Sequence, residues 1–254
     1  MNLKYLRSIS TRMTMVLGLT AALLTTNLDQ ATGGPHEDGD VALAAGNYKA
    51  ALASYQQAAA AGNHWSENSI GSIYEKGLGL AKQPAKACEW YRKAAAGENP
   101  WGQYNYGRCF DEGLSGDKDA ATAIKWFTLA AAQGNSWANY RLGQMHSTGD
   151  GIPKDREKGL AYYIKAAENG NDWAQYAAAE YYSIKAGKMP DMKAAVKWYR
   201  ASAAQKNQWA AYKLALLLIE GRYVTKDIPQ AKSLLNMSAA QGNKAAKKTL
   251  NSLK

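Results

Sequence analysis

The side chains best suited to chemistry in this chain are three histidines and two cysteines. His36, His64 and His146 lie far apart in the sequence and lack the spacing of metal ligands. No nucleophile elbow of the Gly-x-Ser-x-Gly type and no glycine-rich phosphate loop occurs. We therefore expect no enzyme activity, no metal and no cofactor, and we expect His146 to pack as an aromatic side chain.

The two cysteines have a placement that favours a disulfide. Cys88 falls in one predicted helix and Cys109 in the next, at equal distances from the turn at residues 97–100. Across an antiparallel helical hairpin they would face each other, and an exported protein can join them. Two buried free thiols remain the alternative. A redox-active pair is disfavoured, because the Cys-x-x-Cys spacing is missing.

Helices must position these residues, and a repeat predicts where the helices lie. Tryptophan returns every 36 residues, and asparagine keeps the same period. A fixed period of this length is typical of a solenoid, in which each unit stacks only on its neighbours. The tryptophans are Trp65, Trp101, Trp137, Trp173 and Trp209, and the asparagines are Asn63, Asn99, Asn135, Asn171, Asn207 and Asn243.

Each unit reads as two helices. Twelve residues after the tryptophan comes a glycine in every unit but the fourth, which has Lys185, and glycine there would end the first helix. Eighteen residues after the tryptophan the second to fifth units carry an aspartate, which would cap the second helix. An aromatic side chain follows on the second helix in the first four units, with small residues beside it. These small and aromatic positions form the stripe that would pack between the helices.

This pattern resembles the Sel1-like repeat family, relatives of the tetratricopeptide repeats. The matching stretches are Gln103-Tyr104-Asn105-Tyr106-Gly107, residues 149–155, Lys197-Trp198-Tyr199-Arg200 and the Ala-Ala-x-x-Gly-Asn ends such as residues 166–171. The resemblance covers about residue 40 to the C-terminus, and it implies an all-α, right-handed α-solenoid used for protein–protein contact. We divide the chain into a leader (1–33), an N-terminal half-repeat (34–64), five 36-residue repeats (65–244) and a C-terminal capping helix (245–254).

A ladder of aromatic side chains is the candidate binding surface. In tetratricopeptide-like solenoids the first helix lines the concave face, and here its polar arc carries the tryptophans and, three residues later, a tyrosine in the second to fifth units. Rigid aromatic rings and arginines dominate interface hot spots. Packing between units is the competing interpretation of the ladder. The candidate partner-binding residues are Trp101, Tyr104, Arg108, Trp137, Tyr140, Arg141, Gln144, Trp173 and Tyr176.

The N-terminus predicts export. Lys4, Arg7 and Arg12 precede the apolar residues 13–24, as in a secretory signal, and this run is too short to span a bilayer comfortably. An amphipathic or disordered leader is the alternative. The formal net charge of +10 falls to +8 when the leader is removed. Because the basic residues are spread around the repeats without a run of five, we expect no nucleic-acid partner.

Together these features favour a non-enzymatic binding protein of the bacterial periplasm or cell envelope. Among the roles that the resemblance implies, we favour an immunity or inhibitor protein that captures a secreted toxin, such as a type VI secretion effector, and a basic protein suits an acidic toxin. An envelope or motility-associated adaptor is the first alternative. A weak cell-wall or β-lactam hydrolase is the second, although this chain lacks the recurring cysteine pairs of the Sel1-like proteins described as β-lactamases.

Overall fold

The computed structural model describes residues 33–184 and 190–253, and within them every regular element is a helix. The predicted leader and Lys185 lie outside these residues. None of the described helices has the length and apolar character needed to cross a membrane. The thirteen helices of the described residues are α2 (Pro35–Ala44), α3 (Tyr48–Ala60), α4 (His64–Lys76), α5 (Pro84–Ala96), α6 (Pro100–Glu112), α7 (Ala120–Ala132), α8 (Ser136–Thr148), α9 (Arg156–Glu168), α10 (Asp172–Ile184), α11 (Met192–Ala204), α12 (Gln208–Glu220), α13 (Ile228–Ala240) and α14 (Lys244–Ser252).

Capping residues set the ends of these helices. The asparagine column begins the first helices, since Asn99 Oδ1 accepts a hydrogen bond from the Gly102 amide at 2.8 Å. The aspartate column begins the second helices, as in Asp155, which accepts from the Lys158 amide at 2.9 Å. Gln83 occupies the same position before α5 but forms no side-chain cap. Gly113 ends α6 with a φ of 70°, a left-handed conformation that glycine adopts without strain.

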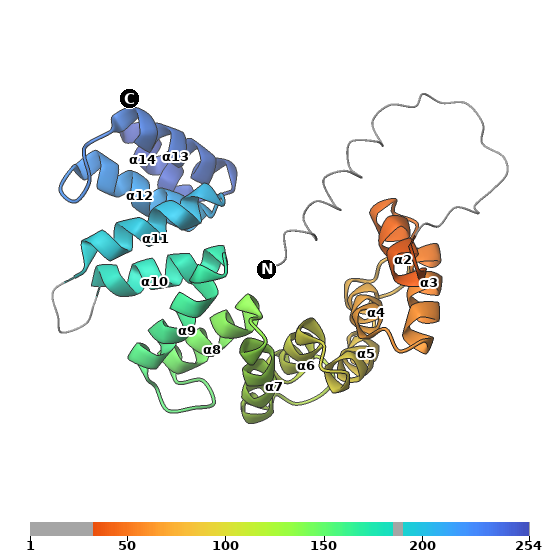
Figure 1. Cartoon of the computed structure of the whole chain (residues 1–254). Helices are drawn as coiled ribbons and strands as arrows, with labels where there is room; N and C mark the ends of the chain where they lie inside the picture. Colours follow the sequence, from red (N-terminus) through yellow and green to blue (C-terminus); the bar gives the residue numbers. More distant parts are fainter. Residues whose placement is uncertain (1–32, 185–189, 254) are drawn as a thin grey trace, which may run out of the picture. The chain divides into compact units, whose positions relative to one another are not determined.

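Successive helices pair in sequence order within residues 35–253, and each pair stacks on the next (Figure 1). The aromatic side chain of a second helix packs against a small residue of the first, and a Cβ built on Gly71 would lie 2.5 Å from the Tyr91 ring. Gly143 has the same relation to Tyr163. A larger side chain in place of either glycine would therefore force the two helices of the repeat apart. The core therefore lies between the two helix layers, as the repeat pattern predicts. Its largest fully buried side chains include Tyr55, Tyr91, Phe127, Ile70, Leu142 and Leu235.

A disulfide joins α5 to α6. Cys88 and Cys109 are bonded, with Cα atoms 5.9 Å apart, and both side chains are buried. This agrees with their predicted placement on opposite sides of a helical hairpin, and it leaves no cysteine of the chain as a free thiol. The bond ties the second helix of one repeat to the first helix of the next.

Candidate partner-binding surface

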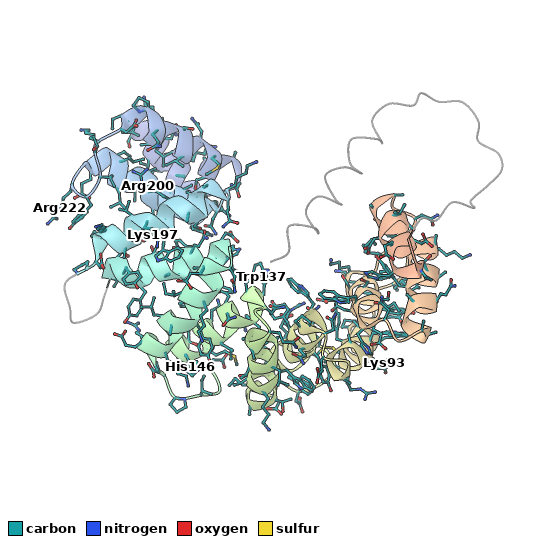
Figure 2. All side chains as sticks on the ribbon, viewed as in Figure 1. Lys93, Trp137, His146, Lys197, Arg200 and Arg222 are labelled. Carbon is teal, nitrogen blue, oxygen red and sulfur yellow. A yellow bond between two sulfur atoms is a disulfide. The ribbon has the colours of Figure 1, made fainter. Side chains whose placement is uncertain are left out.

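The tryptophan column stands at the start of the first helices and is largely open to solvent. Trp101 is 39% exposed, Trp173 37% and Trp209 42%. Trp137, less exposed than these, is labelled at the start of α8 in Figure 2. Fully packed rings would be buried, so the ladder offers indole surface that the fold itself leaves uncovered.

The tyrosine column beside it connects the two helix layers. The Tyr140 ring meets that of Trp137 edge-on at 6.0 Å between centroids, and on its other side it lies 5.8 Å from Tyr163 of α9. Burial, together with the neighbouring Tyr163, raises the pKa of Tyr140 to about 12. Burial and the carboxylate of Glu180 likewise raise the pKa of Tyr176 to about 12. Both hydroxyls therefore keep their protons near neutral pH; the Tyr176 hydroxyl is directed to Glu180, whereas that of Tyr140 accepts from Gln144 and can still donate a hydrogen bond to a partner.

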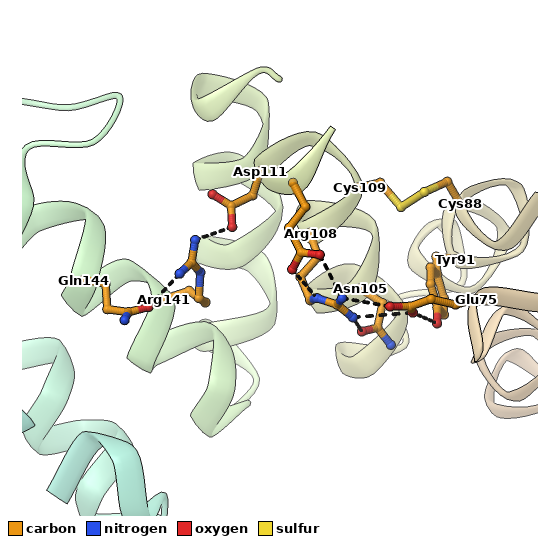
Figure 3. A network of polar contacts seen from close by, with 10 residues as sticks. Glu75, Cys88, Tyr91, Asn105, Arg108, Cys109, Asp111, Arg141 and Gln144 are labelled. Carbon is orange, nitrogen blue, oxygen red and sulfur yellow. Dashed lines mark hydrogen bonds and ion pairs between the residues drawn. A yellow bond between two sulfur atoms is a disulfide. The ribbon is translucent and has the colours of Figure 1, made fainter. Parts of the chain in front are cut away.

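Two predicted contact residues, Arg108 and Arg141, are instead engaged between repeats (Figure 3). Arg108 Nη2 lies 2.8 Å from Glu75 Oε1 in the preceding repeat, and its Nε lies 2.9 Å from Glu112 Oε1. Arg141 pairs with Asp111 of the preceding repeat and donates to Gln144 Oε1 at 2.7 Å. These guanidinium groups are partly buried. Their first role is thus to hold neighbouring repeats together, and only their remaining edges are open to a partner.

The junction between the third and fourth repeats is built differently. Its positions equivalent to Asp111 and Arg141 hold Ser147 and Ala177, and among the described residues no ion pair links α8 to α10. Where these side chains are short, a groove of about 530 Å³ opens. The missing ion pair therefore explains why the groove lies at this junction. The groove is lined by Tyr140, Gln144, Ser147, Arg156, Glu157, Tyr163, Trp173, Tyr176, Ala177, Glu180, Tyr181 and Ile184.

The groove brings together four of the nine predicted contact residues: Tyr140, Gln144, Trp173 and Tyr176. The other five are on the first helices of the second and third repeats and do not line it. Sequence reasoning missed the contributions of α9 and of Glu180. The signal for the groove was nevertheless present, because the small side chains Ser147 and Ala177 occupy the positions that hold Asp111 and Arg141 at the preceding junction.

The charge of this surface differs from the charge of the chain. The first helices α4, α6, α8, α10 and α12 hold seven carboxylates and only four lysines or arginines. Glu180, in the groove, already pairs with Lys213 Nζ at 3.1 Å. The net positive charge is therefore located elsewhere, and the expectation of an acidic partner does not apply to this groove.

The histidines hold ordinary structural positions. His146 is buried as predicted and stacks on Tyr162 with 5.4 Å between ring centroids, and burial lowers its pKa. His64 Nδ1 lies 2.8 Å from a carboxylate oxygen of Glu67. Within the described part of the chain, no group of histidine, cysteine and acidic residues could hold a metal ion.

Comparison with known proteins identifies the repeat. The Sel1 repeat model matches residues 66–99, 102–135, 138–171, 174–207 and 210–243. A Sel1 repeat protein from Oxalobacter formigenes is 32% identical over 85% of this chain and 89% of its own, with a TM-score of 0.80.

More distant solved structures share the fold alone. They include two immunity proteins from Pseudomonas aeruginosa, Pa5087 (24% identity, 75% of this chain and 73% of that one, TM-score 0.53) and PA5088 (20%, 87% and 85%, 0.57). No curated protein matches the sequence.

Proposed function

The chain belongs to the Sel1 repeat family of protein-binding scaffolds, and we propose that it is an immunity protein that captures a secreted toxin in the bacterial envelope. The Sel1 fold is typically a non-catalytic scaffold. Two structural neighbours named immunity proteins support the proposal by analogy of fold. The buried disulfide is consistent with an oxidising compartment.

The groove between the third and fourth repeats carries this proposal. It combines exposed aromatic surface at Trp173 with two protonated tyrosine hydroxyls and the amide of Gln144. Such a mixture resembles the centre of a protein interface, where aromatic rings supply area and a few polar groups set orientation. Because the groove is open to solvent rather than enclosed, a protruding loop or helix of the toxin suits it better than a small molecule.

The chemistry of the groove also indicates which part of a toxin would enter it. Glu157 and Glu180 add carboxylates to the aromatic walls, and among the described residues Arg156 is the one arginine or lysine that lines the groove. An aromatic wall beside a carboxylate favours an arginine or lysine side chain, through cation–π and charge-assisted contacts. We therefore expect an apolar segment with a basic residue, rather than an acidic surface, to occupy the groove.

Co-expression with a candidate toxin tests the proposal. The probe is a secreted effector encoded beside this gene, directed to the periplasm of a bacterial host with and without this protein. We expect growth to be restored only when both proteins are present, and we expect them to co-purify. Toxicity that persists despite a folded, co-exported protein would contradict the immunity role for that pair.

A further inference from the structure

The second helices form a face with the opposite charge to the groove surface. Helices α5, α7, α9, α11 and α13 carry eleven lysines and arginines against three glutamates. The first helices are net acidic, so the two layers of the solenoid divide the charge between them. The basic residues of this second-helix face are Lys86, Arg92, Lys93, Lys125, Arg156, Lys158, Lys165, Lys193, Lys197, Arg200 and Lys232.

Within the described residues these basic side chains form no ion pairs, although Lys86, Lys93, Lys165 and Lys197 lie over aromatic rings. Across the described residues, the lysines and arginines that form ion pairs are Arg108, Arg141 and Lys213, all on first helices. Lys93, Lys197 and Arg200, labelled in Figure 2, are exposed and have no carboxylate partner among those residues. Ten of the eleven basic side chains are exposed. The fold therefore does not account for their number on one face.

Aromatic rings alternate with the lysines. One position of the second helix holds Trp90, Trp126, Tyr162 and Trp198 in successive repeats. Lys93 Nζ lies 3.9 Å from the centroid of the Trp90 ring, and Lys197 Nζ lies 4.7 Å from that of Trp198. The ammonium groups of these lysines thus lie over the faces of rings that are half-buried or buried, and the lysine side chains remain exposed.

We propose that this second-helix face binds the surface of an anionic phospholipid bilayer. Each lysine or arginine near such a surface adds attraction to the negative lipid headgroups, and tryptophan and tyrosine favour the same interfacial layer. This role differs from toxin capture, because ten of the eleven basic residues do not line the groove, and Arg156 of α9 is the one that both surfaces share. It would hold the protein at a membrane surface without any of the described helices crossing it.

The composition of the face favours a lipid surface over other anionic partners. Eight of its eleven basic residues are lysines, and lysine is depleted in protein interfaces, whereas arginine is enriched. Protein surfaces that bind single-stranded nucleic acid offer open aromatic rings on which bases stack. Here lysine side chains lie over the Trp90 and Trp198 rings. Mobile headgroups can rearrange around widely spaced ammonium groups, which a rigid partner cannot do.

Vesicle binding of the full chain tests this proposal. The protein is sedimented with vesicles of phosphatidylcholine alone or of equal parts phosphatidylcholine and phosphatidylglycerol, at low and high salt. The test variant is Lys193→Glu/Lys197→Glu/Arg200→Glu on α11. The matched control is Lys244→Glu/Lys247→Glu/Lys248→Glu on α14, which changes the net charge equally at exposed positions outside the second helices. Thermal melting verifies that both variants fold.

We expect the wild type to prefer the anionic vesicles and to be released by salt. The α11 variant should partition at least about tenfold less, whereas the α14 variant should change far less. Equal loss in both variants would mean that net charge alone drives binding, and this would overturn the assignment to the second-helix face. An equal affinity for the two vesicle types, or binding of DNA in preference to anionic vesicles, would overturn the lipid proposal itself.

Discussion

Trp173 is the residue that best separates binding from packing in the aromatic ladder. Its ring is partly exposed and lines the groove, so its removal takes away contact area without opening a cavity in the core. We expect Trp173→Ala to weaken the affinity for the toxin by about 2 kcal/mol or more, roughly thirtyfold, while the melting temperature changes little. Calorimetric titration and thermal melting measure the two quantities.

Trp209→Ala is the matched control for this prediction. Trp209 has the same position in the fifth repeat and a similar exposure, but it does not line the groove. Its removal should leave the toxin affinity nearly unchanged. If both substitutions lowered the melting temperature strongly and the remaining folded protein kept its affinity, the ladder would be a packing feature.

The ionised carboxylate of Glu75 should make the free energy of unfolding depend on pH. Burial disfavours its charge, but hydrogen bonds from Arg108 and Tyr91 outweigh this and lower the pKa below the usual 4.5. Such a carboxylate stabilises the fold above about pH 4.5, and the contribution is lost as the pH falls through the lowered pKa. Glu75→Gln should therefore cost about 1 kcal/mol of unfolding free energy at pH 7, and this difference should shrink below pH 4.5.

Urea unfolding of wild type and variant across this pH range measures the effect. Glu89→Gln is the control, because Glu89 is an exposed side chain of α5. It should leave the free energy of unfolding nearly unchanged. A Glu75 effect that stays constant down to strongly acidic pH would contradict the role assigned to its ionised form.

The sequence predicts well the role of a residue whose contacts lie within one repeat. It predicts poorly the role of a residue that contacts the neighbouring repeat. Asp155 as a cap and His146 as a packed ring follow from their positions in the unit. Arg108 and Arg141 were expected to face a partner, but each meets a carboxylate of the preceding repeat. These charges meet because neighbouring repeats stack on each other. The positions of residues around a single helix do not show which residues of the next repeat they will contact.

At the scale of elements, the disulfide between α5 and α6 supports a prediction about stability. It closes a segment of 21 residues, which corresponds to about 3 kcal/mol from restriction of the unfolded chain. Cys88→Ala/Cys109→Ala should therefore lower the free energy of unfolding by about that amount. Denaturant titration measures the loss, and alkylation with intact-mass analysis reports whether the wild-type protein is oxidised. Two alkylated cysteines in unreduced protein from an oxidising compartment would contradict the bond.

The helices themselves were readily predicted, whereas the groove was not. A period of 36 residues with caps at fixed positions specifies where α6 and α7 begin and end, since each cap satisfies local backbone groups. The groove depends instead on the side chains that two first helices bring to one junction. Only the comparison of Ser147 and Ala177 with Asp111 and Arg141 reveals it.

This comparison suggests how to close the groove. Ser147→Asp/Ala177→Arg would place between α8 and α10 the ion pair that Asp111 and Arg141 form one junction earlier. We expect the new arginine to fill part of the groove, to abolish toxin binding and to leave the melting temperature equal or slightly higher. Calorimetry and melting curves test this. Ser72→Asp, on α4 and away from the groove, serves as a control for added surface charge.

For the whole molecule, the division of charge between the two helix layers matters more than the net charge. The sequence contains this division, but a search for runs of basic residues does not find it, because each second helix carries only one to three of them and a first helix separates it from the next. Stacking gathers them onto the second-helix layer, as it gathers the tryptophans at the starts of the first helices onto the other layer. The basic residues form no run of five along the sequence, but eleven of them lie on the second helices.

Two separate faces predict two independent binding functions. Trp173 belongs to the first-helix layer, and Lys193, Lys197 and Arg200 belong to α11 in the second. Substitutions at distant sites without shared partners usually act additively. Trp173→Ala should therefore reduce toxin affinity and leave vesicle binding unchanged, whereas the α11 charge reversal should do the opposite. The combined variant should show both losses without a further penalty. Vesicle sedimentation in the presence of saturating toxin tests this independence. We expect the toxin to sediment with the vesicle-bound protein. If the toxin instead released the protein from the vesicles, the membrane and the toxin would compete for one surface.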